Sequence, residues 1–212
     1  MKKTVLYLLS LITFGCNSKN LNPEKVELIN MNSEIGQETA IFAGGCFWCT
    51  EAVFLELEGV IGIKPGYIGG KQANPTYEEV CSGYSGHAEA VKIIFDPSKI
   101  SYGDLLQVFF ATHDPTTLNR QGADAGTQYR SEIFYTNDEQ KKVAQDYMSQ
   151  LDKENTFGKK IVTKISLAST FYVAEDYHQN YYNQNKDKSY CSYVITPKVD
   201  KVRKEFKDKL KK

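Results

Sequence analysis

The sequence predicts an α+β fold: a single domain built as a two-layer sandwich, in which a mixed β-sheet core is flanked by helices. Strand-like and helix-like segments alternate from residue 39 onward, which favours a sheet with helices packed on it. Their spacing is uneven, and several strands are short and bounded by Gly or Pro turns, unlike a regular parallel doubly wound sheet. The 212 residues are enough for one domain with a sizeable core.

The expected elements follow from local patterns. The strands are short apolar runs that close on turn residues such as Gly44-Gly45 or Asp96-Pro97: 39–43, 60–67, 88–95, 133–135 and 161–165. The helices are longer segments rich in helix formers or with apolar residues at helical spacing: 47–57, 77–81, 104–112, 139–154, 174–182 and 198–210. Between them, residues 114–127 form a long segment rich in turn formers, and such loops often carry function.

The N-terminus reads as a targeting segment. Lys2 and Lys3 precede an apolar run over 5–14, which is too short to span a bilayer but typical of a secretory signal. Gly15 and Cys16 follow, which resembles a bacterial lipoprotein signal whose Cys becomes the lipidated first residue. An ordinary signal peptide or a buried first helix is the alternative.

The expected organisation therefore has three parts. Residues 1–15 are a lipoprotein-type signal peptide, 16–38 a polar tether, and 39–212 the folded domain. The expected location is extracytoplasmic, in a bacterial envelope, with the chain anchored to the membrane through Cys16. Lys+Arg and Asp+Glu both number 26, so the balance of charge gives no support to nucleic-acid binding.

The strongest local motif is Gly44-Gly45-Cys46-Phe47-Trp48-Cys49. Cys46 follows a glycine turn and opens a helix, where free N–H groups and the helix dipole favour a thiolate. The motif therefore predicts a reactive thiol with a lowered pKa. A thioredoxin-like CxxC pair, a Cys–His hydrolase and an inert buried Cys are the alternatives. Zinc is disfavoured because Cys81 and Cys191 are isolated and no ligand spacing links the histidines.

Glu89 is the candidate acid. On a strand, alternate residues share a face, so Glu89 lies on the face of Val91, Ile93 and Phe95. A carboxyl on an apolar face has a raised pKa and can hold a proton near neutral pH. The alternative is a Glu that forms a salt bridge near the strand start.

Several segments together resemble one known family. They are 44–48, 74–77 (Asn-Pro-Thr-Tyr), 86–91 (Gly-His-Ala-Glu-Ala-Val), 113–122, Asp124 with 126–131, and 174–179. In this order they are similar to the type A peptide methionine sulfoxide reductases, over about residues 39–200. The resemblance implies that 39–212 is the catalytic domain of an enzyme that repairs oxidised proteins.

The resemblance also implies residue roles. Cys46 would attack the sulfur of the S epimer of methionine sulfoxide, protein-bound or free, and become a sulfenic acid. Glu89 would give its proton to the sulfoxide oxygen, helped by the hydroxyls of Tyr77 and Tyr129. Asp124 would support the polar side of the site. Phe47 and Trp48 would hold the methyl group.

A second thiol, either Cys191 or Cys49, would then form a disulfide with Cys46. No cofactor is implied, and a thioredoxin-like donor would supply electrons. Cys81 is expected to be a packed core thiol, and a monomer is assumed.

Two other functions remain open from the residues alone. A protein that binds oxidised or Met-rich peptides through Phe47 and Trp48 would need no reactive thiol. A general thiol–disulfide exchanger would need Cys49 but not Glu89.

Overall fold

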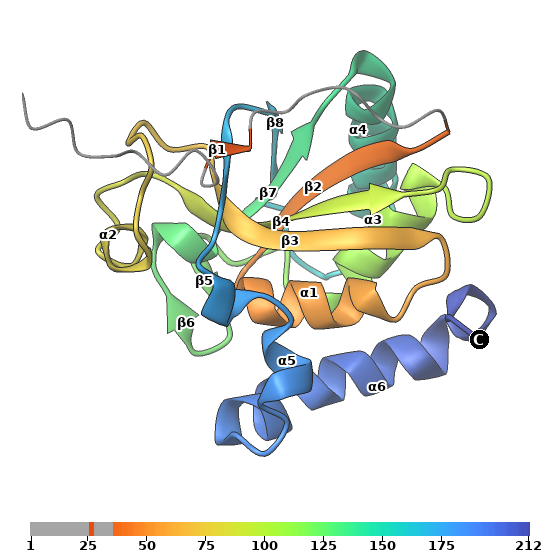
Figure 1. Cartoon of the computed structure of the whole chain (residues 1–212). Helices are drawn as coiled ribbons and strands as arrows, with labels where there is room; N and C mark the ends of the chain where they lie inside the picture. Colours follow the sequence, from red (N-terminus) through yellow and green to blue (C-terminus); the bar gives the residue numbers. More distant parts are fainter. Residues whose placement is uncertain (1–25, 28–35) are drawn as a thin grey trace, which may run out of the picture.

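The computed structural model describes residues 26–27 and 36–212. Within these residues, seven strands form one sheet in the order β1-β9-β3-β4-β2-β7-β8 (Figure 1). Neighbouring strands are antiparallel except β7 and β8, which are parallel, so the sheet is mixed. The strands are β1 (Val26–Glu27), β2 (Glu38–Gly44), β3 (Val60–Ile68), β4 (Ala88–Phe95), β7 (Ser131–Tyr135), β8 (Lys164–Leu167) and β9 (Phe171–Val173).

The helices are α1 (Phe47–Leu55), α2 (Tyr77–Cys81), α3 (Tyr102–Thr112), α4 (Asp138–Lys153), α5 (Tyr181–Gln184) and α6 (Thr196–Glu205). Side-chain caps start three of them, because Thr76, Ser101 and Asn137 each accept a backbone N–H of the first helical turn. A separate two-stranded hairpin joins β5 (Arg120–Gln121) to β6 (Asp124–Ala125).

The main core lies between the sheet and the helices α1 and α3. Phe42 of β2 stacks on Phe54 of α1 at 5.7 Å between ring centroids and on Phe109 of α3 at 5.0 Å. All three rings are almost fully buried. A smaller apolar cluster, which includes Ile41 and Phe171, occupies the other face of the sheet. The expected fold, a mixed sheet with flanking helices in a single domain, is therefore confirmed.

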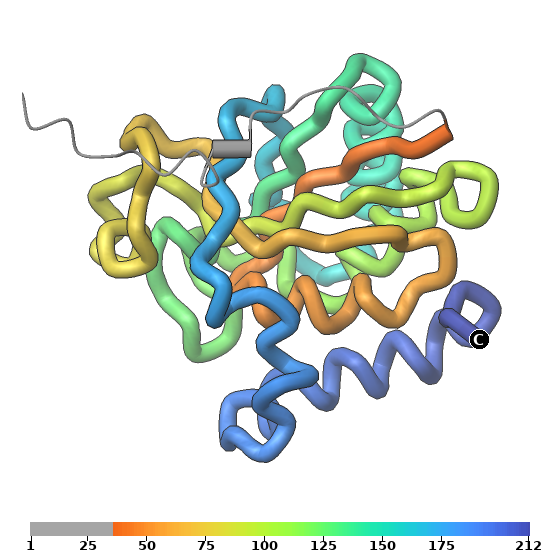
Figure 2. The backbone as a smooth tube through the Cα atoms, viewed as in Figure 1, coloured from red at the N-terminus to blue at the C-terminus, as the bar shows by residue number. Residues whose placement is uncertain are grey.

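The C-terminal part of the chain returns to the start of α1. Figure 2 shows it running from strand β9, past the N-terminal end of α1, and on to α5 and α6. Hydrogen bonds fix this course: Trp48 donates to His178, and Asn180 donates to Glu51. Segments more than 100 residues apart in the sequence therefore meet at one end of one helix.

Some expected elements differ from the structure. Residues 174–182 do not form one helix: a 3-10 turn (Asp176–His178) precedes Asn180, whose left-handed backbone (φ 52°) starts the short α5. The expected strand 161–165 lies further along, at Lys164–Leu167. Strand β9 has three residues, too few to give an alternation in the sequence.

Two further differences concern segments expected to be irregular. The loop 114–127 contains the β5–β6 hairpin. In the proposed tether, Val26–Glu27 pairs with β9 as a short edge strand, because backbone hydrogen bonds need no sequence pattern. The proposed signal peptide and Cys16 lie outside the described residues. Within the described part of the chain, every helix is too short or too polar to cross a membrane.

Candidate active site

A pocket of about 210 Å³ lies at the N-terminal end of α1. It is lined by Cys46, Phe47, Trp48, Tyr77, Glu89, Asp124, Tyr129 and Tyr190. The first seven are the catalytic and substrate-binding residues predicted from the sequence, and five separate segments of the chain bring them together. Tyr190 was not predicted, although its place beside Cys191 was a signal.

Cys46 is the N-cap residue of α1 and is 6% exposed. The preceding Gly45 has φ 91°, a left-handed conformation that favours glycine. A Cβ atom at Gly45 would lie 2.5 Å from Cβ of Gln121, so the glycine also admits the hairpin that carries Asp124. The turn thus sets Cys46 at the pocket wall next to the polar hairpin.

Glu89 lies inside the pocket on the core face of β4 and is 1% exposed. Its Oε2 accepts the backbone N–H of Phe47 at 3.1 Å. Burial raises the pKa of Glu89 to about 8, although the hydrogen bond from Phe47 acts in the opposite direction. The carboxyl therefore holds a proton at neutral pH, as the alternation along the strand predicted, and can donate it.

Two tyrosines and one aspartate add polar atoms to the pocket. Burial raises the pKa of Tyr77 and of Tyr129, and the charge of Glu89 adds to both shifts. Both phenols therefore remain protonated and can donate hydrogen bonds to an oxygen. Asp124 accepts the hydroxyl hydrogen of Tyr190 at 2.6 Å, which holds that ring over the pocket.

The apolar wall is held by stacked rings. Trp48 stacks on Tyr181 with 3.7 Å between centroids and 7° between planes. Its Nε1–H donates to Nδ1 of His178 at 3.0 Å, and Tyr190 meets it edge-on at 6.0 Å. Phe47 packs behind, against Tyr67. The indole is fixed at its nitrogen and over one face, as a preformed site for a small apolar group requires.

The comparisons with known proteins identify the family. A family model described as peptide methionine sulfoxide reductase matches residues 38–210, most of the chain. A peptide methionine sulfoxide reductase MsrA from Deinococcus radiodurans is 61% identical over 175 residues, which is 82% of this chain and 85% of that protein. The chain belongs to the peptide methionine sulfoxide reductase A family. The MsrA protein of Saccharolobus solfataricus is 55% identical over 174 residues, or 82% of this chain and 97% of that one.

Solved structures agree with this assignment. Reduced Mxr1 from Saccharomyces cerevisiae superposes with a TM-score of 0.67 at 33% identity, over 75% of this chain and 91% of that one. Methionine sulfoxide reductase A of Corynebacterium diphtheriae gives 0.63 at 36% identity, over 71% and 76%. As a peptide methionine sulfoxide reductase, the chain is an oxidoreductase.

Three free thiols of this reductase are buried near one another. Cys46, Cys49 and Cys191 share one apolar cluster, and Cys49 and Cys191 are 2% and 0% exposed. Cys49 lies one helical turn after Cys46, outside the pocket lining, and its side chain is hydrogen-bonded to that of Cys46. Cys191 begins a π-helical turn (Cys191–Ile195), a rare geometry that is frequent at functional sites.

The expected lowering of the Cys46 pKa is wrong. Burial raises the pKa of Cys46 well above its usual value, and the side chains of Cys49 and Glu89 raise it further. The hydrogen bond from Cys46 instead lowers the pKa of Cys49 to about 7, with Lys198 and Tyr190 acting in the same direction. Of this pair, Cys46 therefore holds its proton more tightly and Cys49 gives up its proton more readily.

Each histidine of the reductase has a structural partner. His87 accepts from Gly70 N–H, His113 contacts Phe109 O and Ser131 Oγ, and His178 accepts from Trp48. Among the described residues, no group of three or more His, Cys, Asp or Glu could hold a metal ion. The expectation that Cys81 is a packed core thiol is wrong, because it ends the short helix α2 and is exposed.

Proposed function

We propose that this reductase converts the S epimer of methionine sulfoxide, in proteins or free, to methionine through a sulfenic acid on Cys46. The observation that carries the proposal is the meeting of Cys46 and Glu89 in one pocket, with Glu89 protonated at neutral pH. A nucleophile and an acid on the same small cavity are what a sulfoxide reduction needs. The preference for the S epimer rests on membership of the A-type family.

In the first step, Cys46 passes its proton to Cys49, whose thiolate is in hydrogen-bond contact with it. The Cys46 thiolate attacks the sulfoxide sulfur while Glu89 protonates the sulfoxide oxygen, assisted by Tyr77 and Tyr129. The attack forms a bond between the two sulfur atoms. The protonated oxygen then moves to the Cys46 sulfur as this S–S bond and the S–O bond of the substrate break, which leaves methionine and a sulfenic acid on Cys46. Methionine sulfur is thereby reduced by two electrons, and Cys46 is oxidised by two.

In the second step, a neighbouring thiol condenses with the sulfenic acid and water leaves. We propose that Cys49 acts first, because it already contacts Cys46 and its pKa of about 7 lets it release the proton that it took in the first step. Cys191 lies in the same cluster and would take over the disulfide by exchange with Cys49. The relay moves the oxidised pair away from the substrate pocket.

The third step needs a dithiol donor of the thioredoxin kind, which reduces the disulfide and is itself oxidised. All three cysteines are buried, so the segment that carries Cys191 has to open for a protein donor to reach the disulfide. Two thiols of the donor are oxidised to a disulfide for every methionine released.

We also propose that the enzyme works outside the cytoplasm, anchored through a lipid on Cys16. The basic start, the apolar run and the Gly15-Cys16 pair support this location. Growth of the source cells with radiolabelled palmitate should label the wild-type protein and leave a Cys16→Ala variant unlabelled. Label in both, or in neither, would refute the anchor.

A single-turnover assay tests the reaction. The purified protein is mixed with S- or R-methionine sulfoxide without reductant, and methionine and free thiols are counted. We expect one methionine from the S form, two thiols lost and no product from Cys46→Ser. Cys49→Ser should slow the thiol loss, and Cys191→Ser should leave two thiols lost but block turnover with thioredoxin. Absence of methionine from both epimers would refute the proposal.

A further inference from the structure

Glu51 is a buried carboxyl that the proposed chemistry does not use. It lies on α1, in the turn after Trp48, and is 2% exposed. Its Oε1 accepts the backbone N–H of Asn180 at 2.7 Å, and its Oε2 accepts that of Tyr181 at 3.3 Å. Among the described residues, no Lys or Arg forms an ion pair with it, and Lys64 of β3 acts on it only through its field. Burying a carboxylate is costly unless it is hydrogen-bonded, and these two N–H groups offset part of that cost.

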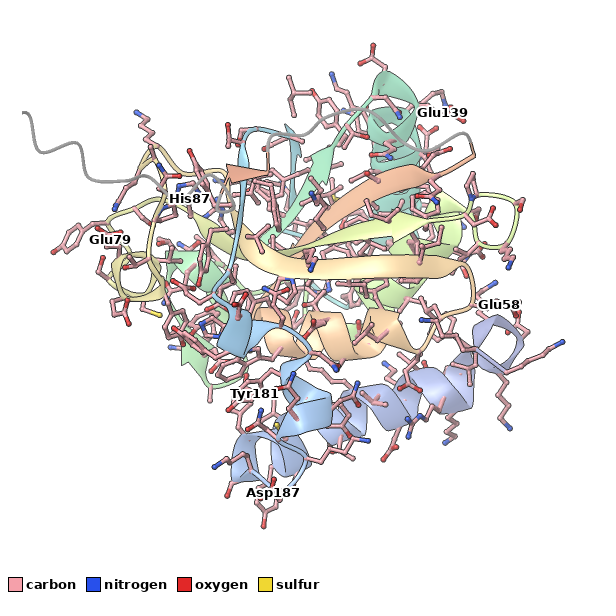
Figure 3. All side chains as sticks on the ribbon, viewed as in Figure 1. Glu58, Glu79, His87, Glu139, Tyr181 and Asp187 are labelled. Carbon is pink, nitrogen blue, oxygen red and sulfur yellow. The ribbon has the colours of Figure 1, made fainter. Side chains whose placement is uncertain are left out.

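The backbone segment that donates to Glu51 also carries the two residues that contact Trp48. Tyr181 stacks on the indole at 3.7 Å, and His178 accepts its Nε1–H at 3.0 Å. Asn180, between them, has a left-handed backbone with φ 52° and makes no side-chain cap for α5. Figure 3 labels Tyr181 where the C-terminal segment passes α1. Glu51 therefore anchors both partners of the indole to the helix that carries the indole.

We infer that Glu51 is a positioning residue, which fixes the wall formed by Trp48 through residues 178–181 and makes substrate binding weaker when its carboxyl is protonated. The inference rests on the proposed function in one respect only, that Trp48 binds the substrate. Glu51 does not touch the pocket and takes no part in proton transfer to the sulfoxide.

The charge state of Glu51 changes near neutral pH. Burial raises the pKa of Glu51 to about 7, although the N–H groups of Asn180 and Tyr181 and the charge of Lys64 act against this shift. Above pH 7 the carboxylate accepts both N–H groups as charge-assisted bonds, which are about twice as strong as neutral ones. Below pH 7 the proton weakens these bonds, and the 178–181 segment is held less firmly.

Other ionisable side chains on elements packed against α1 act differently. Burial lowers the pKa of His178, and its Nδ1 accepts the N–H of Trp48, which favours the neutral ring. Lys64 of β3, and Lys198 and Arg203 of α6, are basic side chains on the elements packed against α1. Glu89 titrates near pH 8, but as the proton donor it acts on kcat. Cys49 of α1 also titrates near pH 7, so only the part of a KM change near pH 7 that Glu51→Gln removes is assigned to Glu51.

The test compares Glu51→Gln with Glu56→Gln. Glu56 is the C-cap residue of the same helix, α1, and pairs with Arg203 at the surface, so it is the matched control. A methionine sulfoxide peptide is assayed from pH 6 to 8.5. We expect KM of the wild type and of Glu56→Gln to rise about three- to tenfold as pH falls through 7. Glu51→Gln should have the raised KM at every pH, with kcat changed less than twofold.

A second measurement needs no turnover. Trp48 is the single tryptophan of the chain, so its fluorescence reports on the wall directly. Cys49, next to Trp48, also titrates near pH 7, so this titration uses the Cys49→Ser protein. We expect its emission to change in one step near pH 7, and that step to be absent when Glu51→Gln is added. A Cys49→Ser emission that is flat through pH 7, or a KM dependence that is as large in Glu51→Gln as in the wild type, would overturn the inference. Because this titration involves no reaction, it separates failure of the Glu51 role from failure of the Cys46 and Glu89 chemistry.

Discussion

Replacing Glu89 with Gln should make the protein more stable at alkaline pH while removing most of its activity. Gln has the shape of a protonated Glu, and its carbonyl oxygen can still accept the N–H of Phe47 that Glu89 accepts at 3.1 Å. The substitution therefore keeps the packing of a side chain that is 1% exposed and removes only the ionisable proton.

The magnitude follows from the pKa of this one group. Burial raises the pKa of Glu89 from 4.5 to about 8, so the folded protein binds the proton more tightly than the unfolded chain does. The stabilisation from this proton is complete below pH 4.5 and is lost as pH rises to about 8. Each pKa unit corresponds to about 1.4 kcal/mol, so the loss above pH 8 is roughly 4 to 5 kcal/mol. Glu89→Gln has no such loss.

The assay is urea unfolding of both proteins at pH 5, 7 and 9, followed by circular dichroism. The free energy of unfolding should be equal within about 1 kcal/mol at pH 5, and Glu89→Gln should be more stable by several kcal/mol at pH 9. Every other titrating group is common to both proteins, so the difference isolates Glu89. A difference that does not change with pH would refute the reasoning that Glu89 is protonated by burial.

Activity should move in the opposite direction. Glu89→Gln can accept the N–H of Phe47 but cannot give a proton to the sulfoxide oxygen. We expect kcat for methionine sulfoxide to fall by at least about 100-fold, the usual contribution of a general acid. In the wild type, kcat should decline above pH 8 as Glu89 ionises. A Glu89→Gln enzyme with wild-type kcat would show that another group protonates the oxygen.

Three further outcomes are expected. Gly66→Ala should lower the free energy of unfolding by about 2 kcal/mol or more in urea titrations, because its Cβ would lie 2.3 Å from the carbonyl oxygen of Tyr172; a neutral result would mean that β9 can shift. Tyr190→Phe removes a hydroxyl that lowers the pKa of Cys49, so iodoacetamide labelling of Cys49 should titrate at higher pH than in the wild type; an unchanged profile would refute that contact. Cys81→Ser should change kcat/KM less than about twofold, because Cys81 is exposed and outside the pocket lining; a large loss would give Cys81 a role in the reaction.

The sequence predicted those parts of the fold that local patterns determine. Strand β4 was found because a largely apolar run closes on Asp96-Pro97, and the period of two along a strand placed Glu89 on the core face. The turn before Cys46 was found because two glycines stand at the end of an apolar run. In both cases the functional residue is positioned by its immediate neighbours in the chain.

The parts that could not be predicted depend on contacts distant in the sequence. Strand β9 exists because β3 and β1 pair with it, and Asn180 takes a left-handed backbone where Glu51 accepts its N–H. Tyr190 lines the pocket because its hydroxyl reaches Asp124, 66 residues away. A sequence pattern holds no record of such pairings, so these residues were found only in the folded chain.

The pKa of Cys46 shows which of two opposing effects is larger at this site. A helix N-terminus stabilises a charge by up to about 2 kcal/mol, or roughly 1.5 pKa units. Full burial shifts a pKa by about 3 to 5 units in the other direction. Burial is therefore the larger effect, and Cys46, 6% exposed beside Glu89, rests as a thiol.

This resting state has a consequence for the reaction. A thiol reacts slowly with oxidants, whereas a thiolate reacts readily. In the proposed reaction, Glu89 protonates the sulfoxide oxygen and so makes the sulfur more electrophilic, while Cys49, with a pKa of about 7, takes the proton from Cys46. The burial that raises the pKa of Cys46 would then slow its reaction with oxidants other than the substrate, because Glu89 and Cys49 supply the acid and the base that the proposed reaction needs.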